Sequence, residues 1–485
     1  MSGLDGLGRE FAARLGQDAV VTERAALRTY ECDGLAAYRC IPGLVVLPRT
    51  TDEVADVVRR CHDLGVPFVA RGSGTGLSGG ALPREDGVLV VLSRMKGIVD
   101  VDVDDQRAVV EPGVINLDVT RAAAPDGFYY APDPSSQQVC SIGGNVAENS
   151  GGAHCLKYGF TVNHVTGLEV VMPDGSVERL GGRAPDPPGY DVIGAFVGSE
   201  GTLGVVTEVT VRLLRRPETV ETLLAAFSTM DEAGAAVGAV IGAGVVPAAV
   251  EMMDALAIEA AEAAVGCGYP AGAGAVLIVE LDGPAAEVGE QLAQVERFCR
   301  DAGAFELRVA ADDAERVAIW RGRKSAFAAV GRISPDYIVQ DGVVPRTALA
   351  QVLRDIAALS AETGIRVANV FHAGDGNLHP LVLFDESRGE TERAETVSDR
   401  IIELCIEHGG SITGEHGVGA DKKKHMGRMF NAVDLDVMQL VRCAFDPDNV
   451  CNPGKVFPTP RLCGERPGRR SGVHPLQEAG VADVF

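Results

Sequence analysis

The chain has 485 residues, which is enough for two or three domains with full hydrophobic cores. With 68 acidic and 44 basic residues, its formal net charge is −24, which argues against binding to nucleic acid or to an anionic membrane surface. Its 11 cysteines show no C-x-x-C spacing, which argues against the usual iron–sulfur and zinc-finger motifs and indicates reduced thiols in a cytoplasmic protein.

No targeting or transmembrane segment is expected. The first residues lack the basic and apolar stretches of a signal peptide. The longest uncharged run, 233–250, contains glycines and Pro247, so a helix followed by a strand explains it better than a membrane span does.

The first part of the chain predicts a βαβ unit. Residues 1–41 are expected to be helical and then irregular. The apolar run 44–47 predicts a strand, and Thr50 followed by Glu53 is a capping-box pattern that predicts the start of a helix. A second strand is expected over 66–70, directly before a glycine-rich stretch.

That stretch contains the pattern G-x-G-x-x-G at residues 74–79, which is typical of a dinucleotide-binding turn when a helix follows it. Here Pro83 and an acidic turn follow, and the run 88–93 then predicts another strand. The glycines are therefore expected between two strands, where backbone N–H groups in a nest-like loop would bind phosphate. A plain glycine turn is the alternative.

The rest of the chain predicts an α+β protein. Residues 88–214 predict strands separated by glycine turns. Two stretches there, 132–152 and 198–204, are crowded with small and polar residues and form either loose loops or a wall around a ligand. After a boundary at 215–217, strands alternate with alanine-rich helices as far as residue 419, which predicts a domain with an antiparallel sheet.

The stretch FHAGDGNLHP predicts a metal site. Asp375-Gly376 is a two-residue hairpin signal, and in that register His372 faces His379. Directly opposed residues have Cβ atoms roughly 4.5–5.5 Å apart on one face of the sheet, so the two imidazoles can chelate one cation. The alternative is a pair of sheet histidines with ordinary hydrogen bonds.

Glu415-His416 offers a carboxylate ligand beside a base. Glycines on both sides allow close approach of a ligand or a cofactor. The alternative is a turn with exposed charges.

Several motifs, taken together, carry a family resemblance. Three glycine-rich segments and the run VGSEGTLGVVTEV resemble the FAD domain of the vanillyl-alcohol oxidase superfamily; the segments are Arg71-Gly72-Ser73-Gly74-Thr75-Gly76, Gly143-Gly144-Asn145 and Asn149-Ser150-Gly151-Gly152. HAGDGNLHP, GEHGVG and NPGK resemble the C-terminal half of its D-2-hydroxy-acid dehydrogenase branch. The match runs in order through about residues 40–457.

The resemblance implies an α+β fold: a PCMH-type FAD-binding domain of two α+β subdomains, and then a cap domain with a large antiparallel sheet covered by helices. A C-terminal segment would return to the FAD domain. The implied boundaries are 1–41 for the N-terminal helical segment, 42–215 for the FAD domain, 216–420 for the cap, 421–460 for the returning segment and 461–485 for a mobile tail.

The resemblance also implies non-covalent FAD, because Thr75 stands where many relatives carry a histidine that bonds to the flavin. The implied FAD-binding residues are Arg71, Gly72, Ser73, Gly74, Thr75, Gly76, Gly79, Pro132, Gly143, Gly144, Asn145, Asn149, Gly151, Gly152, Glu200, Gly201, Gly204, Val206 and Asn452.

For the reaction, the resemblance implies a divalent metal, Zn, Mn or Fe, held by His372, His379 and Glu415, with His416 as the base. A basic segment, WRGRKSAF, would supply a cation for the substrate carboxylate, and Arg321 is the residue chosen. Its neighbours Arg323 and Lys324 are expected on a solvated helix face.

The implied substrate is a short D-2-hydroxy acid, glycolate or D-lactate. Leu381 and Val339 stand where the 2-hydroxyglutarate enzymes of this branch carry an asparagine and a lysine. A D-2-hydroxyglutarate or D-malate dehydrogenase is the alternative within the branch. Alternatives of other classes are an ether-lipid synthase and a flavin-binding companion subunit without catalysis.

Electrons are expected to leave to a partner with iron–sulfur clusters or to a quinone, because the sequence shows neither a cysteine cluster nor a nicotinamide motif. A cytoplasmic location is expected, with membrane association only through such a partner. A homodimer is left open.

Overall fold

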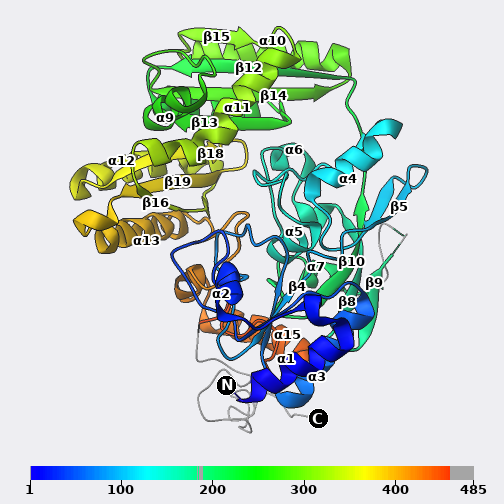
Figure 1. Cartoon of the computed structure of the whole chain (residues 1–485). Coiled ribbons are helices and arrows are strands. Elements are labelled where there is room, and N and C mark those ends of the chain that lie inside the picture. The colour runs from blue at the N-terminus through cyan, green and yellow to red at the C-terminus, as the bar shows by residue number, and fades with distance from the viewer. Residues whose placement is uncertain (1, 183, 185–188, 459–485) are drawn as a thin grey trace.

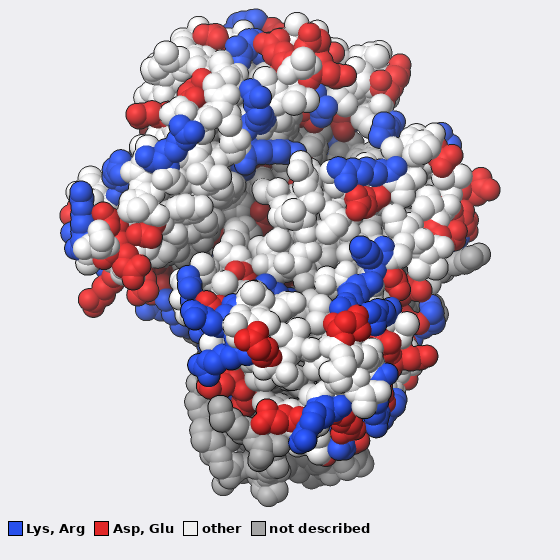
Figure 2. Space-filling view, in the orientation of Figure 1, with Lys and Arg blue, Asp and Glu red and all other residues white. Residues whose placement is uncertain are grey.

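The computed structural model describes residues 2–182, 184 and 189–458 (Figure 1). The expected tail, 461–485, lies outside these residues. In Figure 1 the blue and cyan part of the chain and the orange helix near its C-terminus form the lower part of the molecule, and the green and yellow strands of the cap lie above them. Figure 2 shows acidic and basic side chains interspersed over the same face, which is hollowed between the two parts.

The first sheet is mostly parallel and forms the base of the molecule. Its four strands lie in the order β1 (Val20–Val21), β2 (Leu44–Val46), β4 (Val88–Val91) and β3 (Phe68–Arg71). β4 pairs in parallel with β2 and with β3, and β1 is antiparallel to β2. The helix α1 (Ser2–Leu15) precedes β1, and the short helix α2 (Arg24–Leu27) lies between β1 and β2 in the chain.

The helix α3 (Thr51–Leu64) connects β2 to β3 and begins where the capping pattern predicts. The Thr50 side chain accepts a hydrogen bond from Glu53 N at 3.2 Å. Glu53 reaches back to Arg49 N at 2.6 Å. The glycine-rich stretch after β3 runs to β4 without a helix, as expected, so this loop is no Rossmann turn.

The second sheet is antiparallel and packs beside the first. Its five strands lie in the order β5 (Ile98–Asp102), β6 (Arg107–Val110), β10 (Val205–Arg212), β8 (Val165–Val171) and β9 (Val177–Gly181). The accompanying short elements are α4 (Asn116–Ala123), β7 (Phe128–Tyr129), α5 (Ile142–Glu148), α6 (Cys155–Tyr158), α7 (Val192–Phe196) and β11 (Leu214–Arg215). The helix α5 lies inside the small-residue stretch 132–152, which is therefore more ordered than a loose loop.

The cap is built on an eight-stranded antiparallel sheet. Its strands lie in the order β15 (Glu306–Val309), β12 (Thr219–Phe227), β14 (Ala275–Gly283), β13 (Ala249–Asp254), β18 (Arg366–His372), β19 (Asn377–Phe384) and β16 (Asp336–Val339), with β17 (Gly342–Val343) also paired to β19. The α+β class with a large antiparallel sheet is confirmed.

Helices cover both faces of the cap sheet. One face packs against α8 (Met230–Gly242), α10 (Ala285–Asp301), α12 (Leu349–Thr363) and α13 (Thr391–Glu407). The other packs against α9 (Ala255–Val265) and α11 (Asp313–Ala329). Along β12, Leu223 and Ala225 face the first layer, whereas Leu224 and Ala226 face the second. A strand buried on both sides reads as a continuous apolar run, as residues 223–227 of β12 do.

The end of the chain returns to the first sheet. After α14 (Met426–Met429) and α15 (Ala432–Phe445), Phe68 N donates to Val450 O and Asn452 N donates to Phe68 O, each at 2.8 Å. The backbone thereby extends the β3 edge. Within the described residues, no helix combines the length and apolarity that crossing a membrane requires.

Candidate functional site

A cavity that is partly open to solvent lies among the glycine-rich loops and reaches the loop that carries Glu415 and His416. Most residues expected to bind the cofactor line its wall: Arg71, Gly72, Ser73, Gly74, Thr75, Gly76, Gly143, Gly144, Asn145, Glu200, Gly201, Gly204 and Val206. Glycines leave backbone N–H groups accessible along this wall, so a large dinucleotide with a pyrophosphate fits it. The loops expected to bind the cofactor and the loop that carries Glu415 and His416 therefore line the same cavity.

The other expected cofactor residues lie behind this wall. Asn452 Nδ2 donates to the carbonyl oxygens of Gly80 and Glu200 at 2.8 and 2.7 Å, which ties the C-terminal segment to two cavity loops. The rest shape the backbone of the loops behind it: Gly79, Pro132, Asn149, Gly151 and Gly152. A Cβ at Gly151 would lie 2.7 Å from Glu415 Oε2, so this glycine makes room for the carboxylate of the catalytic loop.

The two histidines of the hairpin share a face, but they are not directly opposed. His372 pairs with Asn377, and His379 pairs with Val370. The expected two-residue turn is wrong, because the turn has four residues, 373–376, closed by a bond from Gly376 N to His372 O at 3.1 Å. Residues 377 and 379 still point to one side of the strand, so the two imidazole centroids lie 5.1 Å apart.

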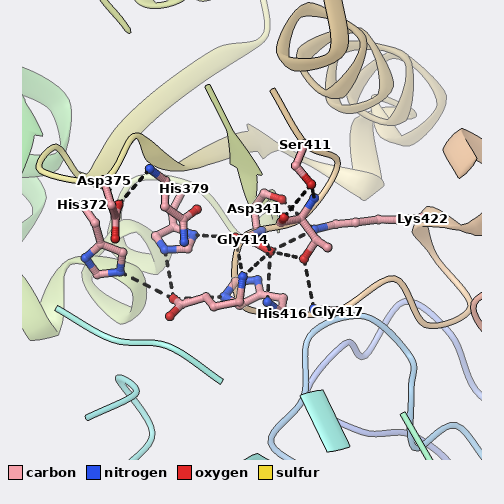
Figure 3. Close-up of polar contacts among 12 residues, drawn as sticks. Asp341, His372, Asp375, His379, Ser411, Gly414, His416, Gly417 and Lys422 are labelled. Atoms are coloured by element: carbon pink, nitrogen blue, oxygen red, sulfur yellow. Dashed lines mark hydrogen bonds and ion pairs between the residues drawn. The ribbon is translucent and has the colours of Figure 1, made fainter. Parts of the chain in front are cut away.

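The Glu415 carboxylate completes a compact donor group with these rings (Figure 3). Its Oε1 lies 3.1 Å from His379 Nε2 and 3.5 Å from His372 Nε2. All three side chains are buried, and His372 Nε2 and Glu415 Oε2 have no hydrogen-bond partner. Two imidazole nitrogens and a carboxylate suit Zn, Mn or Fe, so the side chains present fit the expected cation.

A second group of donors, around Asp341, is less suited to a metal. Asp341 lies near His379 and His416. Its Oδ2, however, already accepts from Gly414 N at 2.9 Å and His416 N at 3.0 Å, and from Thr413 Oγ1 at 2.5 Å. Burial raises its pKa, but Lys422 and the nearby histidines outweigh burial and hold that pKa well below its usual range. Asp341 therefore shapes the catalytic loop as an anion that is already satisfied.

His416 is suited to accept a proton. It lines the cavity, and its ring stacks on that of His379 with centroids 5.0 Å apart and an interplanar angle of 16°. Burial lowers the pKa of His416 to about 4, against the opposing effect of Asp341. The imidazole is therefore neutral near pH 7, which is the state that a general base requires.

The structure corrects the choice of arginine. Arg321 is exposed, and its Nη2 donates to Val265 O of helix α9 at 3.3 Å. Arg323 was expected on the solvated face, but it is buried and its Nε donates to Glu251 Oε2 at 2.6 Å. Residues two apart on a helix point roughly 200° apart, so only one of the two can face inward.

Phe327 connects Arg323 to the cluster. Its ring lies 5.7 Å from the Arg323 guanidinium carbon and 5.7 Å from the His379 ring centroid. The sequence feature that comes nearest to predicting the contact between Arg323 and Phe327 is their spacing, because residues four apart lie on the same side of a helix. No pattern of neighbouring residues in the sequence indicated that Glu251 or Glu148 belongs to this region.

Two family models match the chain: "FAD binding domain" over residues 42–181 and "FAD linked oxidases, C-terminal domain" over residues 216–456. The glycolate oxidase subunit GlcD of Escherichia coli (strain K12) is 54% identical over 437 residues, covering 90% of this chain and 88% of that protein. A D-lactate dehydrogenase of Anaerostipes hadrus is 32% identical over 435 residues, covering 87% and 91%.

Among solved structures, a 4-ethylphenol oxidase from Gulosibacter chungangensis aligns with a TM-score of 0.76 at 19% identity, covering 95% of this chain and 98% of that one. At this identity the likeness shows a shared fold.

Proposed function

Because this chain belongs to the FAD-linked oxidases, we propose that it oxidises a short D-2-hydroxy acid to the 2-oxo acid. The chain is a flavoprotein oxidoreductase that acts on CH–OH donors. Glycolate and D-lactate are the substrates favoured, in keeping with the names of two relatives. The observation that carries the proposal is the buried group of His372, His379 and Glu415, of which Glu415 lines the glycine-lined cavity.

The donor group would hold a divalent metal, and the cavity would hold FAD. A metal bound there would lower the pKa of the substrate hydroxyl and orient the substrate. FAD bound in the cavity would supply the acceptor for the hydride from the substrate α-carbon.

His416 would remove the hydroxyl proton. Its neutral ring lies beside the donor group, with Nε2 3.8 Å from Glu415 Oε1, and it lines the cavity. The backbone N–H of His416 donates to Asp341, so the base is held by a fixed loop.

Arg323 would bind the substrate carboxylate. Its Nη2 is buried and has no hydrogen-bond partner, while its Nε is held by Glu251. A guanidinium that is held by one edge can donate hydrogen bonds from its other edge to a carboxylate. This role replaces the one expected for Arg321.

The apolar wall beside His379 favours a short substrate. Leu381 lies directly opposite Val339 across β16 and β19, and Leu381 is on the same face of its strand as His379. Phe327 packs in the same cluster. A second carboxylate would lose its hydration there, which disfavours D-2-hydroxyglutarate and D-malate.

The electrons from the substrate are proposed to pass to a partner with iron–sulfur clusters or to a quinone. The relative from Escherichia coli is named as a subunit, which supports a partner. With D-lactate or glycolate, the isolated chain should reduce an artificial dye quickly and oxygen slowly. Peroxide formed as fast as dye is reduced would indicate an oxidase that needs no partner.

The substrate assignment is tested by anaerobic bleaching of the flavin with glycolate, D-lactate, L-lactate, D-malate and D-2-hydroxyglutarate. Glycolate or D-lactate should bleach it fastest. Fast bleaching by the diacids alone would overturn the short-substrate assignment. The absence of bleaching by every hydroxy acid would favour a group-exchange enzyme or a companion subunit.

A further inference from the structure

Glu251 is a buried carboxylate beside the candidate metal site. It lies on β13, directly opposite His372 of β18, and its exposed fraction is 0%. Its neighbours on β13 are Val250 and Met252, which belong to the apolar core. An apolar side chain would be the ordinary choice at such a position, because burial of a carboxylate costs several kcal/mol unless it is paired.

Both oxygens of Glu251 are engaged. Oε1 accepts a hydrogen bond from His372 Nδ1 at 2.6 Å, and Oε2 accepts one from Arg323 Nε at 2.6 Å. The carboxylate therefore bridges a strand of the cap sheet and the helix α11, which covers this face of the sheet.

The bond to Oε1 determines which ring nitrogen of His372 faces the donor group. A carboxylate only accepts hydrogen bonds, so Nδ1 carries a proton, and Nε2 is the ring nitrogen left to ligate a metal. Nε2 lies 3.5 Å from Glu415 Oε1 and has no hydrogen-bond partner. His372 is thus held in the orientation that would present Nε2 to a metal.

We propose that Glu251 is a positioning residue that holds His372 ready to ligate the metal and aims Arg323 at the substrate carboxylate. The inference rests on the metal site of the proposed function. A carboxylate partner of a ligating histidine typically contributes about 10–100-fold to metal affinity.

The two substitutions of Glu251 keep different parts of its hydrogen bonding and charge. In Glu251→Gln the amide oxygen can still accept from one partner, but the amide NH₂ then faces the other donor. Glu251→Asp keeps the charge and is shorter by one methylene, so it should restore part of the function. Glu280→Gln is the matched control, because Glu280 is a buried carboxylate on the adjacent strand β14 and pairs with Arg316 and Trp320 instead.

The experiment measures the Zn²⁺ dissociation constant of full-length, FAD-loaded protein by competition with a chromophoric chelator. The d–d spectrum of the Co²⁺-loaded protein reports the ligand geometry, and KM and kcat are measured for the best hydroxy acid. Glu251→Gln should weaken Zn²⁺ binding about 10–100-fold, alter the Co²⁺ spectrum and raise KM, with FAD content unchanged. Glu251→Asp should lie between it and the wild type.

Wild-type Zn²⁺ affinity in Glu251→Gln, or equal weakening in Glu280→Gln, would overturn the role of Glu251 while leaving the metal site intact. If Glu251→Gln does not fold, Glu251→Asp decides, because unchanged affinity and KM there would also overturn the role. A wild-type protein that binds neither Zn²⁺ nor Co²⁺ would remove the metal site itself, and the inference with it.

Discussion

Glu200 accepts a 2.6 Å hydrogen bond from the backbone N–H of Val418, two residues beyond the proposed base His416. The same carboxylate accepts from Gly419 N at 2.7 Å. A residue of the N-terminal half thereby holds the loop that carries Glu415 and His416 against the cavity. Glu148 lies beside this contact, since a Cβ at Gly417 would meet the carboxylates of both Glu148 and Glu200.

The first prediction concerns pH and this carboxyl pair. Burial raises the pKa of Glu200 to about 7, and burial, together with the charge of Glu200, raises that of Glu148 well above its usual range. At these two carboxyl groups the folded state thus binds more protons than the unfolded state. The stability that their protonation contributes to the folded state is complete below a pH of about 4.5 and is lost as the pH rises through about 7. The melting temperature of the wild type should fall between pH 5 and pH 8.

Glu148→Gln mimics the protonated acid, so its melting temperature should fall less over the same range and exceed that of the wild type most at pH 8. Glu200→Gln is the contrasting variant. It should be destabilised at every pH, because an amide cannot accept from both Val418 N and Gly419 N as a carboxylate does. Parallel pH curves for Glu148→Gln and the wild type would contradict the raised pKa of Glu148.

FAD should be bound without a covalent bond. Thr75 lines the cavity. The family resemblance places it where many relatives carry the tethering histidine, and a threonine hydroxyl cannot form that histidyl link. Acid precipitation of the purified protein should release the yellow colour into the supernatant. Flavin that remains with the precipitated protein would rule out this mode of binding.

Glu415 and His416 should fail in different ways. Glu415→Ala should lose most of the bound metal, because its carboxylate lies within 3.1 Å of His379 Nε2. His416→Ala should keep the metal and lose proton abstraction, which typically costs roughly 10²–10⁴ in rate. Metal analysis and stopped-flow flavin reduction separate the two effects.

His408→Ala is the matched control for these variants, since His408 lies at the end of α13 and faces Asp355 at 3.5 Å. It should retain both metal and rate. Equal metal loss in Glu415→Ala and His416→Ala would contradict the division of roles.

Arg323 and Arg321 form a matched pair on one helix. Arg323→Lys should lower kcat/KM by about 10–100-fold, mostly through KM, because a hydrogen bond to a charged group contributes about 1.5–3 kcal/mol. Arg321→Lys should behave as the wild type, because its side chain is exposed. Steady-state kinetics with D-lactate and glycolate checks both. A larger loss in the Arg321 variant would reverse the assignment.

Local sequence was sufficient for the parts of the protein that depend on neighbours along the chain. Thr50 and Glu53 predicted the start of α3 because a cap is formed by residues within one turn. The glycine loop was correctly expected between two strands, since the following proline and acidic turn allow no helix. His372, His379, Glu415 and His416 could be proposed as candidates because their motifs are short and their side chains are distinctive.

Neighbouring residues alone did not determine the register of the β18–β19 hairpin or which side of helix α11 faces the cap sheet. Asp375-Gly376 predicts a turn, but whether two or four residues form it depends on how β18 and β19 pair over their whole length. On the alanine-rich helix α11, sequence periodicity did not distinguish Arg321 from Arg323. The packing of α11 on the cap sheet made that choice, because only Arg323 meets Glu251 there.

The sequence by itself determined the fold class, the glycine-rich cofactor loops and the identity of the candidate ligands, because each depends on residues that are close along the chain. Only the tertiary structure decided which side chains support those ligands. Glu251 lies 121 residues from His372 and 72 from Arg323, and the three meet only because β13 pairs with β18 under α11. A buried charge is stable only among the partners that folding brings to it, so its role becomes visible once those partners are in place.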